Sequence, residues 1–181
     1  MNNIKQEHKS YFKSLNTGDR HTIEDNKTKL YLQADNKVYI IKVDNGIIKN
    51  YKEGIKKCDY LSYSDSDTNF IELKGSEIKE AYEQIEKTIL HLEENKYYSY
   101  LIQNNNVAAF IVSPLRQNCP KNIESKERYL CKKLANLCKN KPKNINSLVK
   151  YVTVKPRLRE SEQVFCTQKL VCSGKVPLHI K

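Results

Sequence analysis

The sequence predicts a mixed α/β (α+β) fold in which a β-sheet is flanked by helices. From residue 28 onward, strand-like segments are followed by a helix, a strand, a second helix and further strands. A helix between two apolar strands favours a right-handed β-α-β crossover. The 181 residues, of which 39% are hydrophobic, suffice for one compact core. We expect a polar N-terminal segment over residues 1–27, loosely structured or helical, and a single domain over residues 28–181.

Alternating apolar residues predict the early strands. Residues 28–43 have the pattern of a β-hairpin, and its turn is Asp35-Asn36-Lys37. The alternating apolar residues of this hairpin are Leu30, Leu32, Val38 and Ile40. Two further strands are expected over residues 58–63 and 69–74, separated by a polar loop.

Two helices follow from apolar residues that recur at helical spacing. The first covers residues 76–95, and Ser76 is a suitable N-cap. The second covers residues 124–139, with one side formed by Tyr129, Leu130, Leu134, Leu137 and Cys138. Between them, the almost continuously apolar residues 107–113 predict a buried central strand. Late strands are expected over residues 149–154 and 163–172.

Composition narrows the choice of partner. No run approaches the ~18 apolar residues of a membrane span, and the N-terminus has no apolar stretch of the secretory type. We therefore expect a cytoplasmic protein without a membrane partner.

The six cysteines show no CxxC spacing, which argues against a zinc site and favours reduced thiols. The net charge of +11 is concentrated in residues 120–159, where twelve Lys/Arg face two acids. This basic C-terminal part favours a polyanion.

One group of residues has the chemistry of a metal site. Side chains alternate along a strand, so Glu72 and Lys74 should share a face. Asp59 begins the preceding predicted strand and can approach Glu72 if the two strands pair. Two carboxylates at close range suit a cation such as Mg²⁺, which prefers oxygen ligands. Other Glu-x-Lys triplets occur in the chain, but only this one lies in an apolar strand that leads through Gly-Ser into an amphipathic helix.

These residues resemble the core of the PD-(D/E)xK phosphodiesterase superfamily, the restriction-endonuclease-like nucleases. The resemblance covers residues 38–114 and rests on the segments Cys-Asp-Tyr-Leu (58–61), Phe-Ile-Glu-Leu-Lys-Gly-Ser (70–76), Ala-Tyr-Glu-Gln-Ile (81–85) and Ala-Phe-Ile-Val-Ser-Pro (109–114). It implies that Asp59, Glu72 and the Leu73 backbone carbonyl hold Mg²⁺ or Mn²⁺. It also implies that Lys74 is the catalytic lysine and that Gln84 is the helix glutamine of several branches.

The sequence departs from that family at three places. Cys58 stands where the family has a proline before the first acid. Thr88 stands where some branches have a tyrosine. Many members carry a further acid on an N-terminal helix, for which Glu7, Glu24 and Asp25 are the candidates.

Together these features predict metal-dependent phosphodiester hydrolysis of nucleic acid, with DNA favoured and a homodimer compatible with the fold. The residues expected to contact the nucleic-acid backbone are Lys132, Lys133, Lys139, Lys141, Lys143, Lys155, Arg157 and Arg159. Two alternatives stay open. One is a non-catalytic nucleic-acid-binding protein on the same fold, and the other is an interaction module whose basic face binds an acidic protein. Cleavage, and the salt dependence of binding, separate the three.

Overall fold

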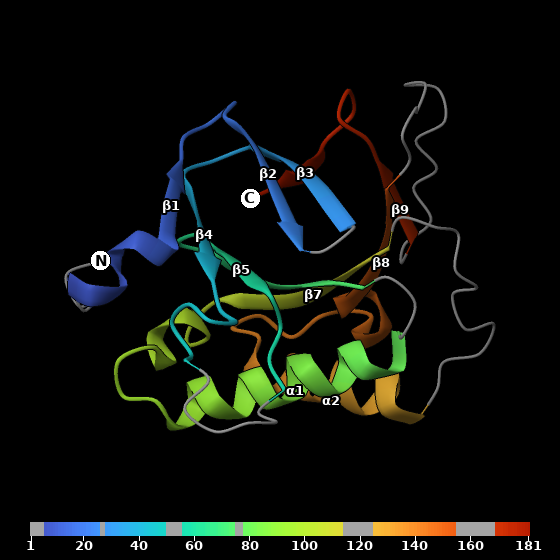
Figure 1. Cartoon of the computed structure of the whole chain (residues 1–181). Coiled ribbons are helices and arrows are strands. Elements are labelled where there is room, and N and C mark those ends of the chain that lie inside the picture. Colours follow the sequence, from blue (N-terminus) through green and yellow to red (C-terminus); the bar gives the residue numbers. More distant parts are fainter. Residues whose placement is uncertain (1–5, 26–27, 50–55, 75–77, 114–124, 155–168) are drawn as a thin grey trace.

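The chain folds into three layers, described by a computed structural model for residues 6–25, 28–49, 56–74, 78–113, 125–154 and 169–181. Within these residues, seven strands form one mixed sheet and three strands form a second. The helices α1 (Ile78–Glu94) and α2 (Ser125–Leu137) cover one face of the larger sheet, and the smaller sheet lies over its other face (Figure 1). The expected mixed α/β class is therefore confirmed.

Within each sheet the strands follow the order in which they occur in the chain. Across the larger sheet they are β1 (Phe12–Leu15), β4 (Val38–Lys42), β5 (Tyr60–Tyr63), β6 (Asp67–Leu73), β7 (Asn106–Ser113), β8 (Val149–Val154) and β9 (Lys169–Cys172). Across the smaller sheet they are β10 (Leu178–Ile180), β3 (Thr28–Ala34) and β2 (Arg20–Asp25). Short 3₁₀ helices cover Gln6–Tyr11, Ser99–Leu101 and Ile145–Leu148.

The centre of the larger sheet confirms the predicted β-α-β unit. Strands β6 and β7 pair in parallel, and α1 connects them. Strand β7 is apolar throughout because both of its faces are covered. Val107, Ala109 and Ile111 pack in the core beneath the helices, whereas Phe110 and Val112 pack against the smaller sheet.

The predicted hairpin over residues 28–43 is wrong, although both of its strands exist. Strand β3 pairs with β2 and β10, and β4 pairs with β1 and β5, so the two strands belong to different sheets. The alternating residues Leu30, Leu32, Val38 and Ile40 all face one core between the sheets. Alternation thus identified the buried side of each strand, which is compatible with more than one strand partner.

The N-terminal segment contains strands that its polarity did not indicate. Strand β1 pairs with β4, and β2 pairs with β3. In β2 only Ile23 is buried, because one face of this strand lies on the core and the other faces solvent. A single apolar residue leaves no periodic pattern, so the expectation of a loose or helical segment is wrong for β1 and β2, whereas Gln6–Tyr11 is a 3₁₀ helix.

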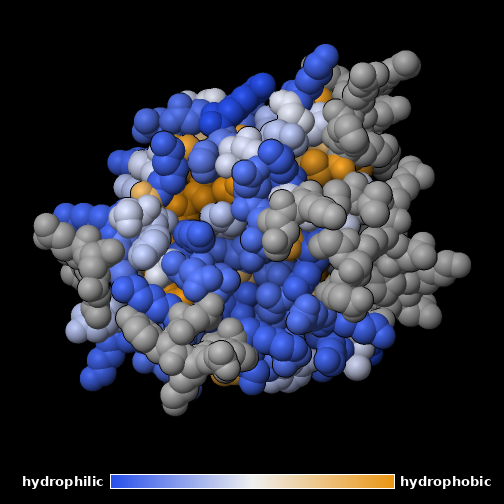
Figure 2. Space-filling model, viewed as in Figure 1, coloured by the Kyte–Doolittle hydropathy of each residue, from blue (hydrophilic) through white to orange (hydrophobic). Residues whose placement is uncertain are grey.

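Both helices lie within their predicted ranges. The predicted buried side is correct for α1 and differs at one residue in α2. Ala81, Ile85, Ile89 and Leu92 of α1 are fully buried, as their spacing predicts. In α2, Leu130 and Leu134 are buried, but Tyr129 is 56% exposed and does not share their face. Neither helix has the length and apolarity required to cross a membrane. Figure 2 shows a mostly hydrophilic surface on one side of the molecule, with apolar side chains visible in its upper half, around the smaller sheet.

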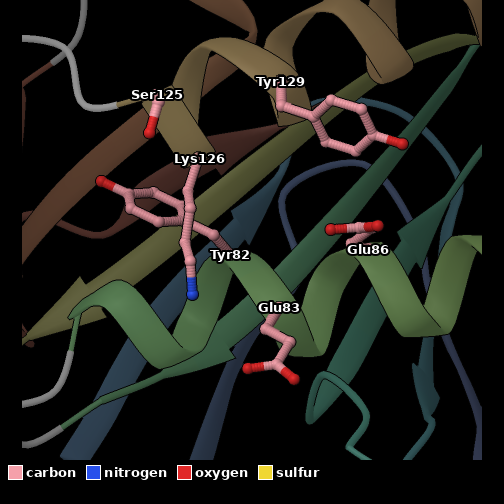
Figure 3. A pocket seen from close by; sticks show the side chains of 6 residues that line it. All are labelled: Tyr82, Glu83, Glu86, Ser125, Lys126 and Tyr129. Atoms are coloured by element: carbon pink, nitrogen blue, oxygen red, sulfur yellow. The ribbon is translucent and has the colours of Figure 1, made fainter.

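A shallow pocket lies between the two helices. Figure 3 shows its lining, which is contributed by α1 and by the start of α2: Tyr82, Glu83, Glu86, Ser125, Lys126 and Tyr129. None of the residues that the sequence predicts to be functional lines this pocket. Asp59, Glu72 and Lys74 lie instead at one end of the paired strands β5 and β6.

Candidate metal site

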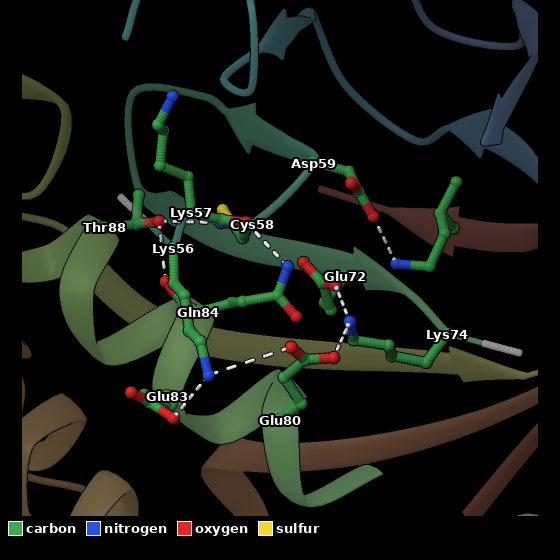
Figure 4. A network of polar contacts seen from close by, with 11 residues as sticks. Lys56, Lys57, Cys58, Asp59, Glu72, Lys74, Glu80, Glu83, Gln84 and Thr88 are labelled. Atoms are coloured by element: carbon green, nitrogen blue, oxygen red, sulfur yellow. Dashed lines mark hydrogen bonds and ion pairs between the residues drawn. The ribbon is translucent and has the colours of Figure 1, made fainter. Parts of the chain in front are cut away.

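The antiparallel pairing of β5 and β6 brings Asp59 to Glu72. The register joins Tyr60 to Ile71, so the residue before β5 lies opposite Glu72. The Leu73 N–H donates to Oδ2 of Asp59 at 2.7 Å, which fixes the Asp59 carboxylate against β6 (Figure 4). The Asp59 carbonyl in turn accepts from the Val43 N–H at 2.9 Å. Asp59 is therefore held from both neighbouring segments of the sheet.

Glu72 is a buried acid with an oxygen that lacks a partner. Its side chain lies on the helical side of β6 and is 1% exposed. Oε1 lies 3.4 Å from Nζ of Lys74, whereas Oε2 is buried without any hydrogen-bond donor among the described residues. Burial, together with the charge of Asp59, raises the pKa of Glu72 to about 9 despite the nearby Lys74. In the absence of a further cation, Glu72 therefore holds a proton at neutral pH.

The pKa of Asp59 is also raised, although less than that of Glu72. Burial raises its pKa to about 6, the hydrogen bond from Leu73 opposes this shift, and the charge of Asp25 adds to it. Asp25 ends β2, and the tip of this strand lies over β5 because the Tyr60 hydroxyl donates to the Glu24 carbonyl at 3.3 Å. Asp59 thus lies near the tip of β2, at the end of the β5–β6 pair.

Of the three candidates for the further acid implied by the family resemblance, only Glu7 belongs to a helix, the 3₁₀ helix Gln6–Tyr11. Glu24 and Asp25 belong to β2, and the Glu24 carboxylate pairs with Lys29 at 2.8 Å. The side chain of Glu7 lies outside the described residues. Among the described residues, no group of three or more His, Cys, Asp or Glu side chains is placed to hold a metal ion. Of the acids that the sequence predicts as metal ligands, the described residues bring together Asp59 and Glu72.

Lys74 lies between two carboxylates. It continues the strand, since its N–H donates to the Val112 carbonyl at 2.7 Å, and its side chain shares the face of Glu72 as predicted. Its Nζ lies 2.9 Å from Oε2 of Glu80, which is closer than the contact with Glu72. Burial lowers the pKa of Lys74, but the hydrogen bond to Glu80 and the charge of Glu72 outweigh it and raise the pKa above its ordinary value.

Gln84 and Thr88 attach α1 to the segment that carries Asp59. The Gln84 Nε2 donates to the Lys57 carbonyl at 3.1 Å, and the Cys58 N–H donates to the Thr88 hydroxyl at 2.8 Å. The Thr88 hydroxyl donates in turn to the Gln84 carbonyl. The Gln84 Oε1, like Oε2 of Glu72, is buried without a donor. Two unpaired acceptor oxygens therefore adjoin the segment from Lys57 to Asp59.

Cys58, the residue before Asp59, is fully buried. Burial first, and the neighbouring Glu72 charge second, raise the pKa of its thiol well above the usual value. Without a metal ion, Cys58 is therefore a neutral thiol.

Sequence reasoning missed the partner of Lys74. Glu80 lies in the first turn of α1, six residues after Lys74, and it also lies 3.8 Å from Lys56. Lys56 pairs more closely with Glu83, at 3.0 Å. The available signal was the placement of Glu80 one helical turn before Gln84, on the side of α1 that faces the end of β6.

Lys139, the predicted basic residue whose position a backbone contact fixes, does not adjoin the two acids. Lys132, Lys139, Lys141 and Lys143 are exposed and Lys133 is half-buried. The Lys139 N–H donates to the Asn105 carbonyl, which places it beside Asn106 and therefore beside Asp67, at the start of β6. Five strand residues, or about 17 Å, separate Asp67 from Glu72. Lys155, Arg157 and Arg159 lie outside the described residues.

No family model, curated protein or solved structure matches this chain. Asp59 and Glu72, both with raised pKa values, lie with Lys74 at one end of the β5–β6 pair, in the interior of the larger sheet. Among the described residues, Oε2 of Glu72 and Oε1 of Gln84 have no hydrogen-bond donor. This arrangement is suited to hold a hard cation beside a fixed positive charge.

Proposed function

We propose that Asp59, Glu72 and Lys74 form the centre of a metal-dependent phosphodiesterase with a restriction-endonuclease-like fold, acting on nucleic acid and preferentially on DNA. The observation that carries this proposal is that Oε2 of Glu72 is buried without a hydrogen-bond donor among the described residues. The pKa of this acid is raised by burial and by the charge of Asp59. A buried acceptor of this kind is costly unless a proton or a cation occupies it.

The donor set fits Mg²⁺ or Mn²⁺. Asp59, Glu72 and the Leu73 carbonyl are the oxygens that would hold the ion, and water and a substrate phosphate would complete its coordination. A divalent ion bound there supplies positive charge to polarise a phosphate and to lower the pKa of a bound water. Such an ion would also keep Glu72 in its charged form, which its burial otherwise disfavours.

Lys74 supplies the other part of the chemistry. Its ammonium group is fixed by two carboxylates and is only 15% exposed. From that position it would orient the attacking water and stabilise the charge that develops on the phosphate. The Leu73 N–H holds the Asp59 carboxylate against β6, and the Gln84 amide holds the Lys57 carbonyl. These two hydrogen bonds keep Asp59 in place beside Glu72.

In the basic C-terminal part, Lys139 would contact the backbone of the substrate away from the two acids. The start of β6 lies about 17 Å from Glu72, which corresponds to about five base pairs along a duplex. Substrates shorter than this would reach the acids without the lysines, and their binding would depend less on salt.

The alternative is a protein that binds nucleic acid without cleaving it. The finding that favours this alternative is that the described residues contain no group of three or more His, Cys, Asp or Glu side chains placed to hold a metal ion. Cleavage assays decide between the two functions.

The test compares wild type with Lys74→Ala on DNA and on RNA, in Mg²⁺ and in Mn²⁺. We expect Lys74→Ala to slow cleavage by about 10²-fold or more, because the fixed charge near the phosphate is lost, while nucleic-acid affinity changes little. Lys87→Ala is the matched control, since Lys87 is an exposed lysine of α1. A wild type that binds nucleic acid but cleaves none in either metal establishes the alternative.

A further inference from the structure

The ammonium group of Lys74 is held more closely by Glu80 than by Glu72. Figure 4 shows its Nζ between the two carboxylates, at 2.9 Å from Glu80 and 3.4 Å from Glu72. Glu72 comes from the same strand as Lys74, whereas Glu80 comes from the first turn of α1. The lysine is therefore tied to two different elements of the fold.

Burial distinguishes this contact from an ordinary surface ion pair. The side chain of Glu80 is 42% exposed, that of Lys74 is 15% exposed and that of Glu72 is 1% exposed. Exposed pairs contribute little because water screens them and because both side chains are free to move. Lys74 contacts the buried Glu72 on one side, and this contact already restricts the position of its ammonium group. The contact with Glu80 restricts it further.

The two carboxylates that contact Lys74 have different roles. Glu72 is the acid that we assign to a cation, and its contact with Lys74 uses Oε1. If Lys74 had no other partner, its ammonium group would move onto Glu72 and compete with that cation for the same carboxylate. A second carboxylate on the outer side prevents this movement and keeps the ammonium group between the strand and the helix.

We propose that Glu80 is a positioning residue that holds the ammonium group of Lys74 beside Glu72 without letting it neutralise that acid. This inference rests on the proposed function, because it concerns how the lysine and the cation share one carboxylate. Lys56, at 3.8 Å from the other oxygen of Glu80, steadies Glu80 from the solvent side.

The experiment measures Mn²⁺ affinity and cleavage for Glu80→Gln in two backgrounds, wild type and Lys74→Met. In wild type we expect Glu80→Gln to weaken Mn²⁺ binding by about three- to ten-fold and to lower kcat by about ten-fold, with KM for DNA nearly unchanged. In the Lys74→Met background, Glu80→Gln should leave Mn²⁺ affinity unchanged, because its effect acts through the lysine. Glu80→Asp should restore part of both effects.

Glu93→Gln is the matched control, since it removes an exposed carboxylate from the far end of α1. Urea unfolding of each variant establishes that it is folded. An equal loss of Mn²⁺ affinity in both backgrounds would overturn the positioning role, because Glu80 would then act only through its own charge. Unchanged kcat and Mn²⁺ affinity for Glu80→Gln would overturn it as well. A wild type that neither binds Mn²⁺ nor cleaves refutes the proposed function itself, and the role of Glu80 with it.

Discussion

The buried Glu72 makes the stability of the metal-free protein depend on pH. Its pKa is about 9 in the folded protein, against an ordinary value of 4.5. Between these two values the folded chain keeps a proton on Glu72 that the unfolded chain has released. The free energy of unfolding therefore falls as pH rises from about 4.5 towards 9, where the loss is complete.

The magnitude follows from this difference in bound protons. One proton per molecule changes the free energy of unfolding by up to about 1.4 kcal/mol for each pH unit. Raising the pH from about 5.5 to about 8.5 should therefore remove up to about 4 kcal/mol. A loss of that size is a large fraction of the 5–15 kcal/mol that typically separates folded from unfolded protein.

The assay is urea unfolding followed by circular dichroism, in the presence of a chelator, across this pH range. Glu72→Gln should flatten the dependence, because a neutral amide occupies the same space. Adding Mg²⁺ at the alkaline end should restore stability to wild type, since an ion that binds only the folded chain stabilises it. Glu93→Gln, which removes an exposed acid from α1, should keep the wild-type slope. A wild type whose unfolding midpoint is flat from about pH 5.5 to 8.5, or a Glu72→Gln variant with the wild-type slope, would refute the reasoning.

Two further predictions concern the scaffold that supports the site. Gly46→Ala should destabilise the protein by about 2–3 kcal/mol in urea unfolding, because an added Cβ would lie 2.0 Å from the Lys42 carbonyl oxygen. Gly174→Ala is its control, since the Cβ there meets only a side chain at 3.4 Å; an equal loss in both variants would contradict the steric cause. Thr88→Val should cost about 1–3 kcal/mol, because the buried Cys58 N–H loses its acceptor. The half-buried Thr153→Val should cost less, and a neutral Thr88→Val would show that this hydrogen bond is dispensable.

Much of the fold follows from local patterns. Helical spacing of apolar residues identified α1, and the unbroken apolar run identified β7 as a central strand with both faces covered. The pleat of a strand placed Glu72 and Lys74 on one face, because side chains two residues apart always point the same way. Each of these features depends on residues that are close together in the sequence, so the sequence is sufficient to predict them.

Strand partners and partners of side chains required the tertiary structure. The same alternation suits β3 and β4 either as a hairpin or as members of two facing sheets, and only packing across the core selects the second arrangement. Polar strand β2 forms because β3 offers it an edge.

The candidate site divides in the same way. The sequence by itself determined that Asp59, Glu72 and Lys74 could meet, because it specifies the strands and the side-chain face of each residue. Only the tertiary structure decided how deeply Glu72 is buried, that its Oε2 lacks a donor among the described residues and that Glu80 holds Lys74. The physical reason is that desolvation and ion pairing depend on distances between elements, and these distances are set by how α1 packs on the sheet.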